Sequence, residues 1–133
     1  MIKLLGEIVT LMGRSDLHQK WAIGDVLRLM GPPLLHRQFV ELREGGKLVG
    51  FGTFGFLTKE AGQGFSDRTR KLQPDDWKAG DNIWIVDSLA PLGHGTELAQ
   101  LLRDTLIEKG FKGRRVTFVR VKGDERRISE VVL

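Results

Sequence analysis

The chain has 133 residues and a formal net charge of +4 at pH 7, and its 41% hydrophobic and 29% charged residues are the balance of an ordinary globular domain. The absence of cysteine excludes a disulfide scaffold, thiol catalysis and thiolate metal or iron–sulfur sites. No apolar run approaches the roughly 20 residues of a membrane span, and Glu7 interrupts the N-terminal stretch too early for a signal peptide. We therefore expect one cytoplasmic domain over residues 1–133 with no membrane span.

Two amphipathic helices are predicted first. Apolar residues recur at helical spacing over residues 2–13 and again over residues 21–31. Between them, Ser15 or Asp16 is a candidate cap for a short helix, because either side chain can accept backbone N–H bonds. A Gly-Pro-Pro sequence at 31–33 predicts a sharp end to the second helix, since proline has no N–H group to donate.

The following segments predict strands. Residues 36–43 and 47–57 flank a Glu-Gly-Gly turn and predict a hairpin. The polar residues 58–73 predict no element beyond a helical turn, and a turn-rich connector follows at 73–81. Residues 82–89 are mostly apolar and predict a strand in the middle of the sheet.

The C-terminal part predicts a helix over residues 96–109, with a stripe of leucines, and two strands over 114–122 and 126–133. The complete order of elements indicates an α+β domain with a mixed, mainly antiparallel sheet.

Two polar residues are candidates for a site. Asp87 lies in an otherwise apolar strand, so it either caps the following turn or serves a function, because an unpaired buried carboxylate is costly. His18 lies in a polar stretch where helix packing does not require it, and imidazole is the natural base near pH 7. His18 and Asp87 are a candidate dyad, although the sequence does not determine whether they meet. We expect His36 at a strand start and His94 in an exposed turn, without a catalytic role.

Two backbone and charge features are weaker signals. Gly93 and Gly95 precede a helix whose free N–H groups suit a phosphate or an oxyanion, although an ordinary turn capped by Thr96 is the alternative. Residues 112–127 hold seven basic and two acidic residues, a net charge of +5. This stretch is either a solvated edge or a docking face for an acidic partner, and the lack of a recognition helix disfavours nucleic acid. No P-loop or zinc-ligand motif is present, so no metal is expected.

Three segments resemble the signature motifs of the RTX-toxin-activating lysine acyltransferases. In this sequence they read Ser15-x-x-His18-x-x-Trp21, Asp76-Trp77-x-x-Gly80-Asp81 and Trp84-x-x-Asp87-x-x-Ala90-Pro91-x-Gly93. The resemblance implies a GNAT-like fold and an acyltransferase, typically a homodimer, without a permanently bound cofactor. Its donor is the acyl-phosphopantetheine of acyl carrier protein, and its acceptor is the ε-amino group of internal lysines in an RTX-type protoxin.

The resemblance also implies roles for individual residues. The essential histidine of the family falls on His18, its important aspartate on Asp87 and its signature serine on Ser15. His18 would act as the base or carry the acyl group, and Asp87 would orient it. Backbone N–H groups near Gly93 and Gly95 would steady the oxyanion or the phosphopantetheine arm. An acyl chain needs an apolar slot, which the glycine-spaced strand at 48–56 is expected to line.

Acyl carrier proteins are strongly acidic, so the basic stretch becomes a predicted docking face for them. The residues expected to contribute are Arg114, Arg115, Arg120 and Lys122. Two alternatives remain: an acyltransferase with a different amine acceptor, and a non-catalytic basic domain that binds nucleic acid or an acidic protein.

Overall fold

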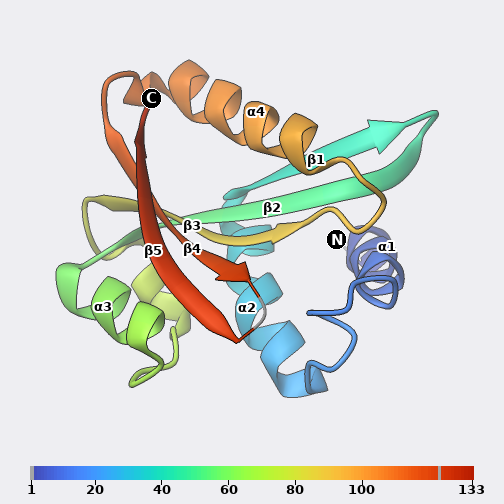
Figure 1. The fold of residues 1–133 in the computed structure, drawn as a ribbon, viewed down its shortest axis with the longest axis horizontal. Coiled ribbons are helices and arrows are strands. Elements are labelled where there is room, and N and C mark those ends of the chain that lie inside the picture. Colours follow the sequence, from blue (N-terminus) through green and yellow to red (C-terminus); the bar gives the residue numbers. More distant parts are fainter. Residues whose placement is uncertain (1, 123) are drawn as a thin grey trace.

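A five-stranded sheet organises the computed structural model, which describes residues 2–122 and 124–133 (Figure 1). The strands lie side by side in the order in which they occur in the chain. Neighbouring strands are antiparallel except β3 and β4, which are parallel. The mixed sheet and the central place of β3 are therefore confirmed. The strands are β1 (Phe39–Glu44), β2 (Lys47–Leu57), β3 (Asn82–Leu89), β4 (Arg115–Lys122) and β5 (Glu125–Val132).

Helices cover both faces of this sheet. Helix α4 packs on one side, which we call the α4 face, and α1, α2 and α3 lie on the other, which we call the α2 face (Figure 1). In the described residues, no helix combines the length and the apolar character needed to cross a bilayer. The helices are α1 (Ile2–Met12), α2 (Ile23–His36), α3 (Lys59–Asp67) and α4 (Gly95–Leu106), with short helical turns η1 (Pro74–Lys78) and η2 (Ile107–Phe111).

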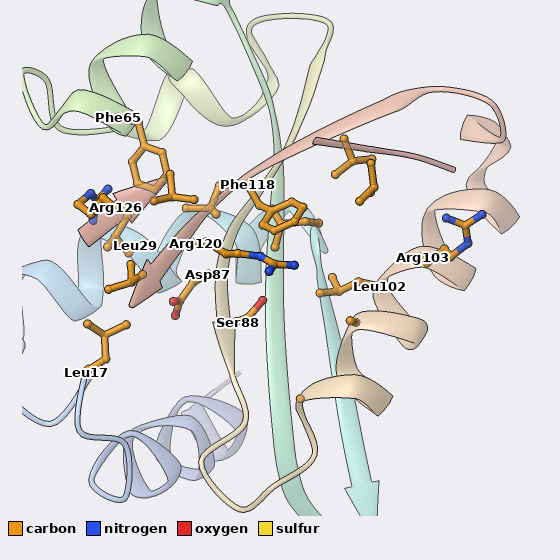
Figure 2. Close-up of a pocket in the computed structure, with 18 of the residues that line it drawn as sticks. Leu17, Leu29, Phe65, Asp87, Ser88, Leu102, Arg103, Phe118, Arg120 and Arg126 are labelled. Carbon is orange, nitrogen blue, oxygen red and sulfur yellow. The ribbon is translucent and has the colours of Figure 1, made fainter. Parts of the chain in front are cut away.

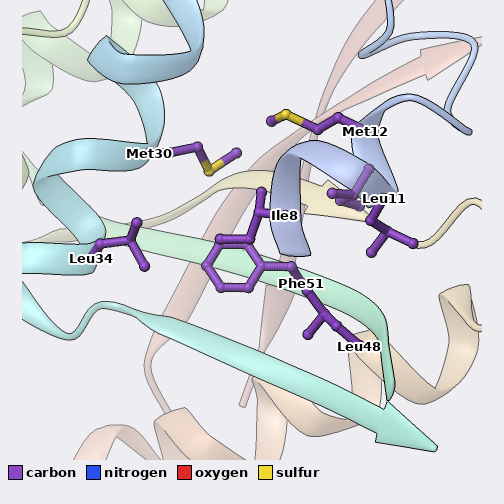
Figure 3. Close-up of a cluster of buried hydrophobic side chains, with 8 residues drawn as sticks. Ile8, Leu11, Met12, Met30, Leu34, Leu48 and Phe51 are labelled. Carbon is purple, nitrogen blue, oxygen red and sulfur yellow. The ribbon is translucent and has the colours of Figure 1, made fainter. Parts of the chain in front are cut away.

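Alternation along the strands divides the core between the two faces. Ile83 of β3 packs with the leucines of α4, whereas the next residue, Trp84, packs on the α2 face. Toward the other end of the α2 face, Ile8 of α1 and Met30 of α2 close over Phe51 of β2 (Figure 3). The amphipathic patterns of the first two helices are thereby explained by one shared cluster.

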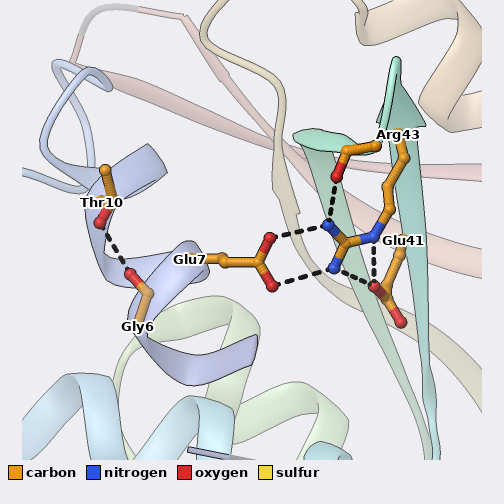
Figure 4. A network of polar contacts seen from close by, with 6 residues as sticks. Gly6, Glu7, Thr10, Glu41 and Arg43 are labelled. Atoms are coloured by element: carbon orange, nitrogen blue, oxygen red, sulfur yellow. Dashed lines mark hydrogen bonds and ion pairs between the residues drawn. The ribbon is translucent and has the colours of Figure 1, made fainter. Parts of the chain in front are cut away.

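An ion pair also ties α1 to the sheet. The Arg43 guanidinium donates to both carboxylate oxygens of Glu7, at 2.7 and 3.0 Å, and to Glu41 on its own strand (Figure 4). The hydrogen bonds from Arg43 lower the pKa of the Glu7 carboxyl below its usual value.

The second helix does not end at its prolines, so that prediction is wrong. Helix α2 continues through Pro32 and Pro33 to His36, and Arg37 ends it in the left-handed conformation with φ 57°. A proline inside a helix costs about 3 kcal/mol, but both prolines here are buried, and packing of this apolar turn offsets the cost. His36 therefore ends a helix instead of opening a strand, and β1 begins at Phe39.

The hairpin and the segment after it show how local chemistry sets the backbone. Gly45 and Gly46 have φ angles of 57° and 81°, which form the two-residue turn predicted between β1 and β2. Where only a helical turn was expected, the structure has helix α3, which begins because the Thr58 hydroxyl accepts the Ala61 N–H at 3.1 Å.

Candidate active site

An irregularity in β3 decides where Asp87 points. Thr53 of β2 pairs with Asp87, but the next residue, Phe54, pairs with Ile85, so Val86 is an extra residue in β3. A bulge of this kind interrupts the alternation of side chains and bends the strand. Val86 and Asp87 consequently both face the α2 side, whereas regular alternation would direct Asp87 toward α4.

The bulge brings Asp87 to His18 and completes a hydrogen-bonded relay with Ser15. The His18 Nε2 lies 2.9 and 3.0 Å from the two carboxylate oxygens of Asp87, and the Nδ1 lies 2.6 Å from the Ser15 Oγ. Because a carboxylate only accepts hydrogen bonds, Nε2 carries a proton, and in the neutral ring Nδ1 accepts the Ser15 hydroxyl. His18 is 4% exposed, so the imidazole is held in one orientation in a largely dry environment.

The local sequence between α1 and α2 positions three of the motif residues together. The Gln19 N–H donates to the Ser15 carbonyl at 2.9 Å, and the Trp21 N–H donates to the His18 carbonyl at 3.0 Å. These consecutive turns bring Ser15, His18 and Trp21 to one side of the loop. The Trp21 ring lies over the imidazole, with ring centroids 4.8 Å apart.

A cavity of about 880 Å³ opens beside the relay, where β3 and β4 separate (Figure 2). Within the described chain, the two strands pair at Ile83–Val116, Trp84–Thr117 and Ile85–Phe118 and not beyond. Of the relay residues, Asp87 lines the cavity, and His18 and Ser15 lie behind it. The cavity reaches both faces of the sheet. Its apolar walls include Trp21, Leu29, Phe65 and Val119 on the α2 face and Ala99, Leu102 and Phe118 on the α4 face.

The predicted glycine turn, at Gly93 and Gly95, approaches this cavity from the α4 face, whereas the relay lies on the α2 face. Gly95, the first residue of α4, lines the cavity, and Gly93 belongs to the turn before it with a φ of 91° that favours glycine. Since α4 and the relay lie on different faces, the turn and the relay meet only through the gap between β3 and β4.

His94, between these glycines, is not the exposed residue that was expected. Its side chain is 16% exposed, and its Nε2 lies 3.0 Å from the Glu44 carboxylate. This contact joins the β3–α4 turn to the end of the β1–β2 hairpin.

The glycine-spaced strand does not provide the acyl slot that was expected. A Cβ on Gly52 would lie 2.9 Å from the Leu102 side chain, and one on Gly55 would lie 3.2 Å from the Trp77 ring. These glycines therefore allow close packing of α4 and of Trp77 on β2. None of the described residues that line the cavity comes from β2.

The four basic residues predicted to dock acyl carrier protein do not form one patch. Arg114 and Arg115 lie at the start of β4, about 20 Å along the strand from Arg120 and Lys122. Arg114 donates to the Asp81 carbonyl at 2.8 Å, and Arg115 lies 3.4 Å from Glu130. Arg120 lines the cavity. The stretch is continuous in sequence but divided in space.

Comparison with known proteins decides the family. The sequence model of the RTX toxin acyltransferase family matches residues 1–132. The chain belongs to this family. The sequence signal was the three motifs, of which the first and third contribute the residues of the relay. Sequence reasoning missed Phe65, Arg68 and Arg126 as cavity residues, and the one available signal was an aromatic residue within the polar stretch 58–73.

Curated members of the RTX toxin acyltransferase family match most of the chain. The RTX-II toxin-activating lysine-acyltransferase ApxIIC of Actinobacillus pleuropneumoniae is 31% identical over 75% of this chain and 62% of its own length. The lysine-acyltransferase RtxC of Vibrio cholerae is 28% identical over 92% of this chain and 80% of its own. The protein-lysine myristoyltransferase RtxC of Kingella kingae is 28% identical over 84% and 67%, respectively. The chain thus spans 62–80% of the length of these relatives, and less than two-thirds of ApxIIC.

Proposed function

We propose that this protein is a protein-lysine acyltransferase that moves a fatty acyl group from acyl-acyl carrier protein to an internal lysine of an RTX-type protoxin. The observation that carries the proposal is the Ser15–His18–Asp87 relay, with His18 buried, at the wall of a mostly apolar cavity. The names of the relatives support lysine as the acceptor group. A parallel strand pair that separates around the cavity supports a GNAT-like arrangement of donor and acceptor on the two faces.

The relay can remove the proton that prevents a lysine from reacting. An ammonium group has no lone pair, so it must lose a proton before it attacks a thioester. The Asp87 carboxylate lines the cavity and attracts the ammonium. Ser15 lies on the side of the imidazole away from Asp87 and behind the cavity wall, so the ammonium proton reaches the His18 Nδ1 through solvent and the half-buried Ser15 hydroxyl, and Asp87 stabilises the imidazolium.

The freed amine then attacks the thioester carbonyl carbon. The new C–N bond forms as the C–S bond breaks, and the leaving phosphopantetheine thiolate takes back a proton from His18. The nitrogen of the new amide then releases its extra proton to the neutral His18, which passes it to solvent. Both imidazole nitrogens are engaged in hydrogen bonds, so an acyl-imidazole would require one of them to be released. The geometry therefore favours His18 as proton acceptor over His18 as acyl carrier.

The donor enters from the α4 face in this proposal. The Gly95 N–H group at the start of α4 is available for the thioester oxyanion or the phosphopantetheine arm, and the Arg120 guanidinium lies at the cavity on β4. Arg120 and Lys122, two residues apart on one face of β4, are the half of the basic stretch placed to meet an acidic carrier protein.

The test is transfer from acyl-acyl carrier protein to a lysine-containing protoxin segment, followed by intact mass. The expected product carries one acyl group per modified lysine. Asp87→Asn should lower the rate by roughly 10²- to 10⁴-fold, whereas Asp16→Asn, an exposed carboxyl in the same loop as His18, should retain the rate. Transfer to small amines but to no protein lysine would favour a different acceptor. No turnover, together with salt-sensitive DNA binding, would contradict the proposal.

A further inference from the structure

Two arginines, Arg68 and Arg126, line the α2-face side of the cavity and form no ion pair with any residue that the structure describes. Arg68 ends helix α3 in the left-handed conformation with φ 64°, and its N–H donates to the Gly64 carbonyl, so its backbone is fixed. Arg126 lies near the start of β5, beside Phe65 in the cavity wall (Figure 2). The two side chains come from segments that are 58 positions apart in the sequence.

The register of the last two strands places Arg126 on the same face as the relay. Arg126 lies opposite Val121, which by alternation faces the same way as Val119, and Val119 packs in the α2-face core. Arg127, the next residue, lies opposite Arg120 and faces the α4 side. Adjacent arginines of one strand therefore serve different faces of the sheet.

Neither guanidinium is neutralised within the described residues. Arg68 and Arg126 form no ion pair there, in contrast to Arg127, which lies 3.1 Å from Glu125. The Nε of Arg126 is buried and has no hydrogen-bond partner in the same part of the chain. Burial and the nearby charge of Arg68 lower the pKa of the Arg126 guanidinium.

The carboxylates that line the cavity already have partners. Asp25 accepts from Arg28 at 3.2 Å, and Asp87 accepts from His18. On the α2 face of the cavity, Arg68 and Arg126 thus remain without a carboxylate partner among the described residues. A buried donor without a partner is unfavourable, and a bound carboxylate would satisfy it with short, charge-assisted hydrogen bonds in the geometry that guanidinium groups prefer.

We propose that Arg68 and Arg126 bind a carboxylate of the acceptor segment, so that the enzyme prefers a lysine with a glutamate or aspartate close by in sequence. This inference rests on the proposed function and adds an acceptor-specificity site to it. An acceptor is favoured over the donor because the pair lies on the face of the Ser15–His18–Asp87 relay, whereas Gly95 and Arg120 lie on the α4 face.

The experiment compares two lysine peptides that differ only in glutamate or glutamine at the positions flanking the lysine. The wild-type protein should show a kcat/KM ratio of about tenfold in favour of the glutamate peptide. Arg126→Gln and Arg68→Gln should each lower this ratio to near one. Arg127→Gln removes the same charge from the adjacent residue on the other face and should keep the wild-type ratio. Equal use of both peptides by the wild type would overturn the inference, as would an equal loss of preference in Arg127→Gln.

A binding measurement separates this inference from the proposed function. Fluorescence anisotropy of the two labelled peptides, without any acyl donor, should show tighter binding of the glutamate peptide, lost in Arg126→Gln. Preferential binding without acyl transfer would support the acceptor site and contradict the transferase proposal. Acyl transfer without a preference for the glutamate peptide would support the transferase proposal and contradict the acceptor site. A raised KM for acyl-acyl carrier protein in Arg126→Gln, with the peptide preference intact, would assign the pair to the donor and overturn the inference.

Discussion

Strands β3 and β4 are paired with each other along one half of their length and separated along the other, and the two halves have different roles. In the paired half, Ile83 and Val116 are 1% and 2% exposed and form the core under α4. In the open half, Val86 and Val119 both line the cavity, and the two strands do not pair there in the described chain. One pair of strands therefore supplies rigidity at one end and space for chemistry at the other.

The difference has a local cause. The extra residue Val86 bends β3 and interrupts its alternation at the point where the pairing with β4 stops. The same bulge aims Asp87 at His18. The feature that opens the cavity thus also assembles the relay at its wall, and the intact half keeps both in place.

The largest expected effect on activity comes from a substitution in the relay beside the open half. His18→Ala should lower acyl transfer by roughly 10²- to 10⁴-fold, because the proton acceptor is lost, while the circular dichroism spectrum stays that of the folded protein. His36→Ala, at the end of α2, is the matched control and should retain activity. Transfer at the wild-type rate by His18→Ala would remove this residue from the mechanism.

A substitution in the core under the paired half should lower the stability of the fold and have less effect on activity. Ile83→Ala removes a side chain from the α4-face core and should lower the free energy of unfolding by about 2–5 kcal/mol, measured by urea denaturation. Transfer per folded molecule should change far less than in His18→Ala. If the folded Ile83→Ala protein were as inactive as His18→Ala, the two halves would not be separable.

Filling the open half sharpens the comparison. Val119→Phe places a ring in the cavity and should lower the rate with a long-chain acyl donor by roughly 10- to 100-fold, because the donor no longer reaches its productive position. A short-chain donor should be affected less. Val132→Phe adds the same bulk at an exposed position of β5, so rates with both donors should match the wild type. An equal loss for short and long chains would argue against acyl binding in the gap.

The smallest effect is expected far from both halves, at the pair that ties α1 to the sheet. The Glu7 carboxyl has a lowered pKa in the folded protein, so its contribution to stability is present above the unfolded pKa of about 4.5 and is lost as the pH falls through the folded value. Glu7→Gln should therefore have a lower urea midpoint than the wild type at pH 7, and the difference should vanish near pH 3. A difference that persisted at pH 3 would point to packing as its source.

Much of the local structure followed from the sequence. The hairpin turn at Gly45 and Gly46 was correctly predicted, because a left-handed backbone at both positions leaves few residue choices. The end of α2 was not, since tertiary packing outweighed the local penalty of Pro32 and Pro33. The acyl slot expected along β2 was also wrong, because the sequence does not distinguish a glycine that contacts a ligand from one that allows close packing, here of α4 on Gly52 and of Trp77 on Gly55.

The sequence by itself determined the family motifs, the approximate order of the elements and the His18 and Asp87 candidates. Short-range spacing fixes such features, as in the turns that bring Ser15, His18 and Trp21 together. Only the tertiary structure decided which face Asp87 occupies and that Arg68 and Arg126 line the same cavity. Those outcomes depend on a one-residue bulge and on contacts between distant segments, and side-chain alternation makes a shift of one residue reverse the face on which every following group lies.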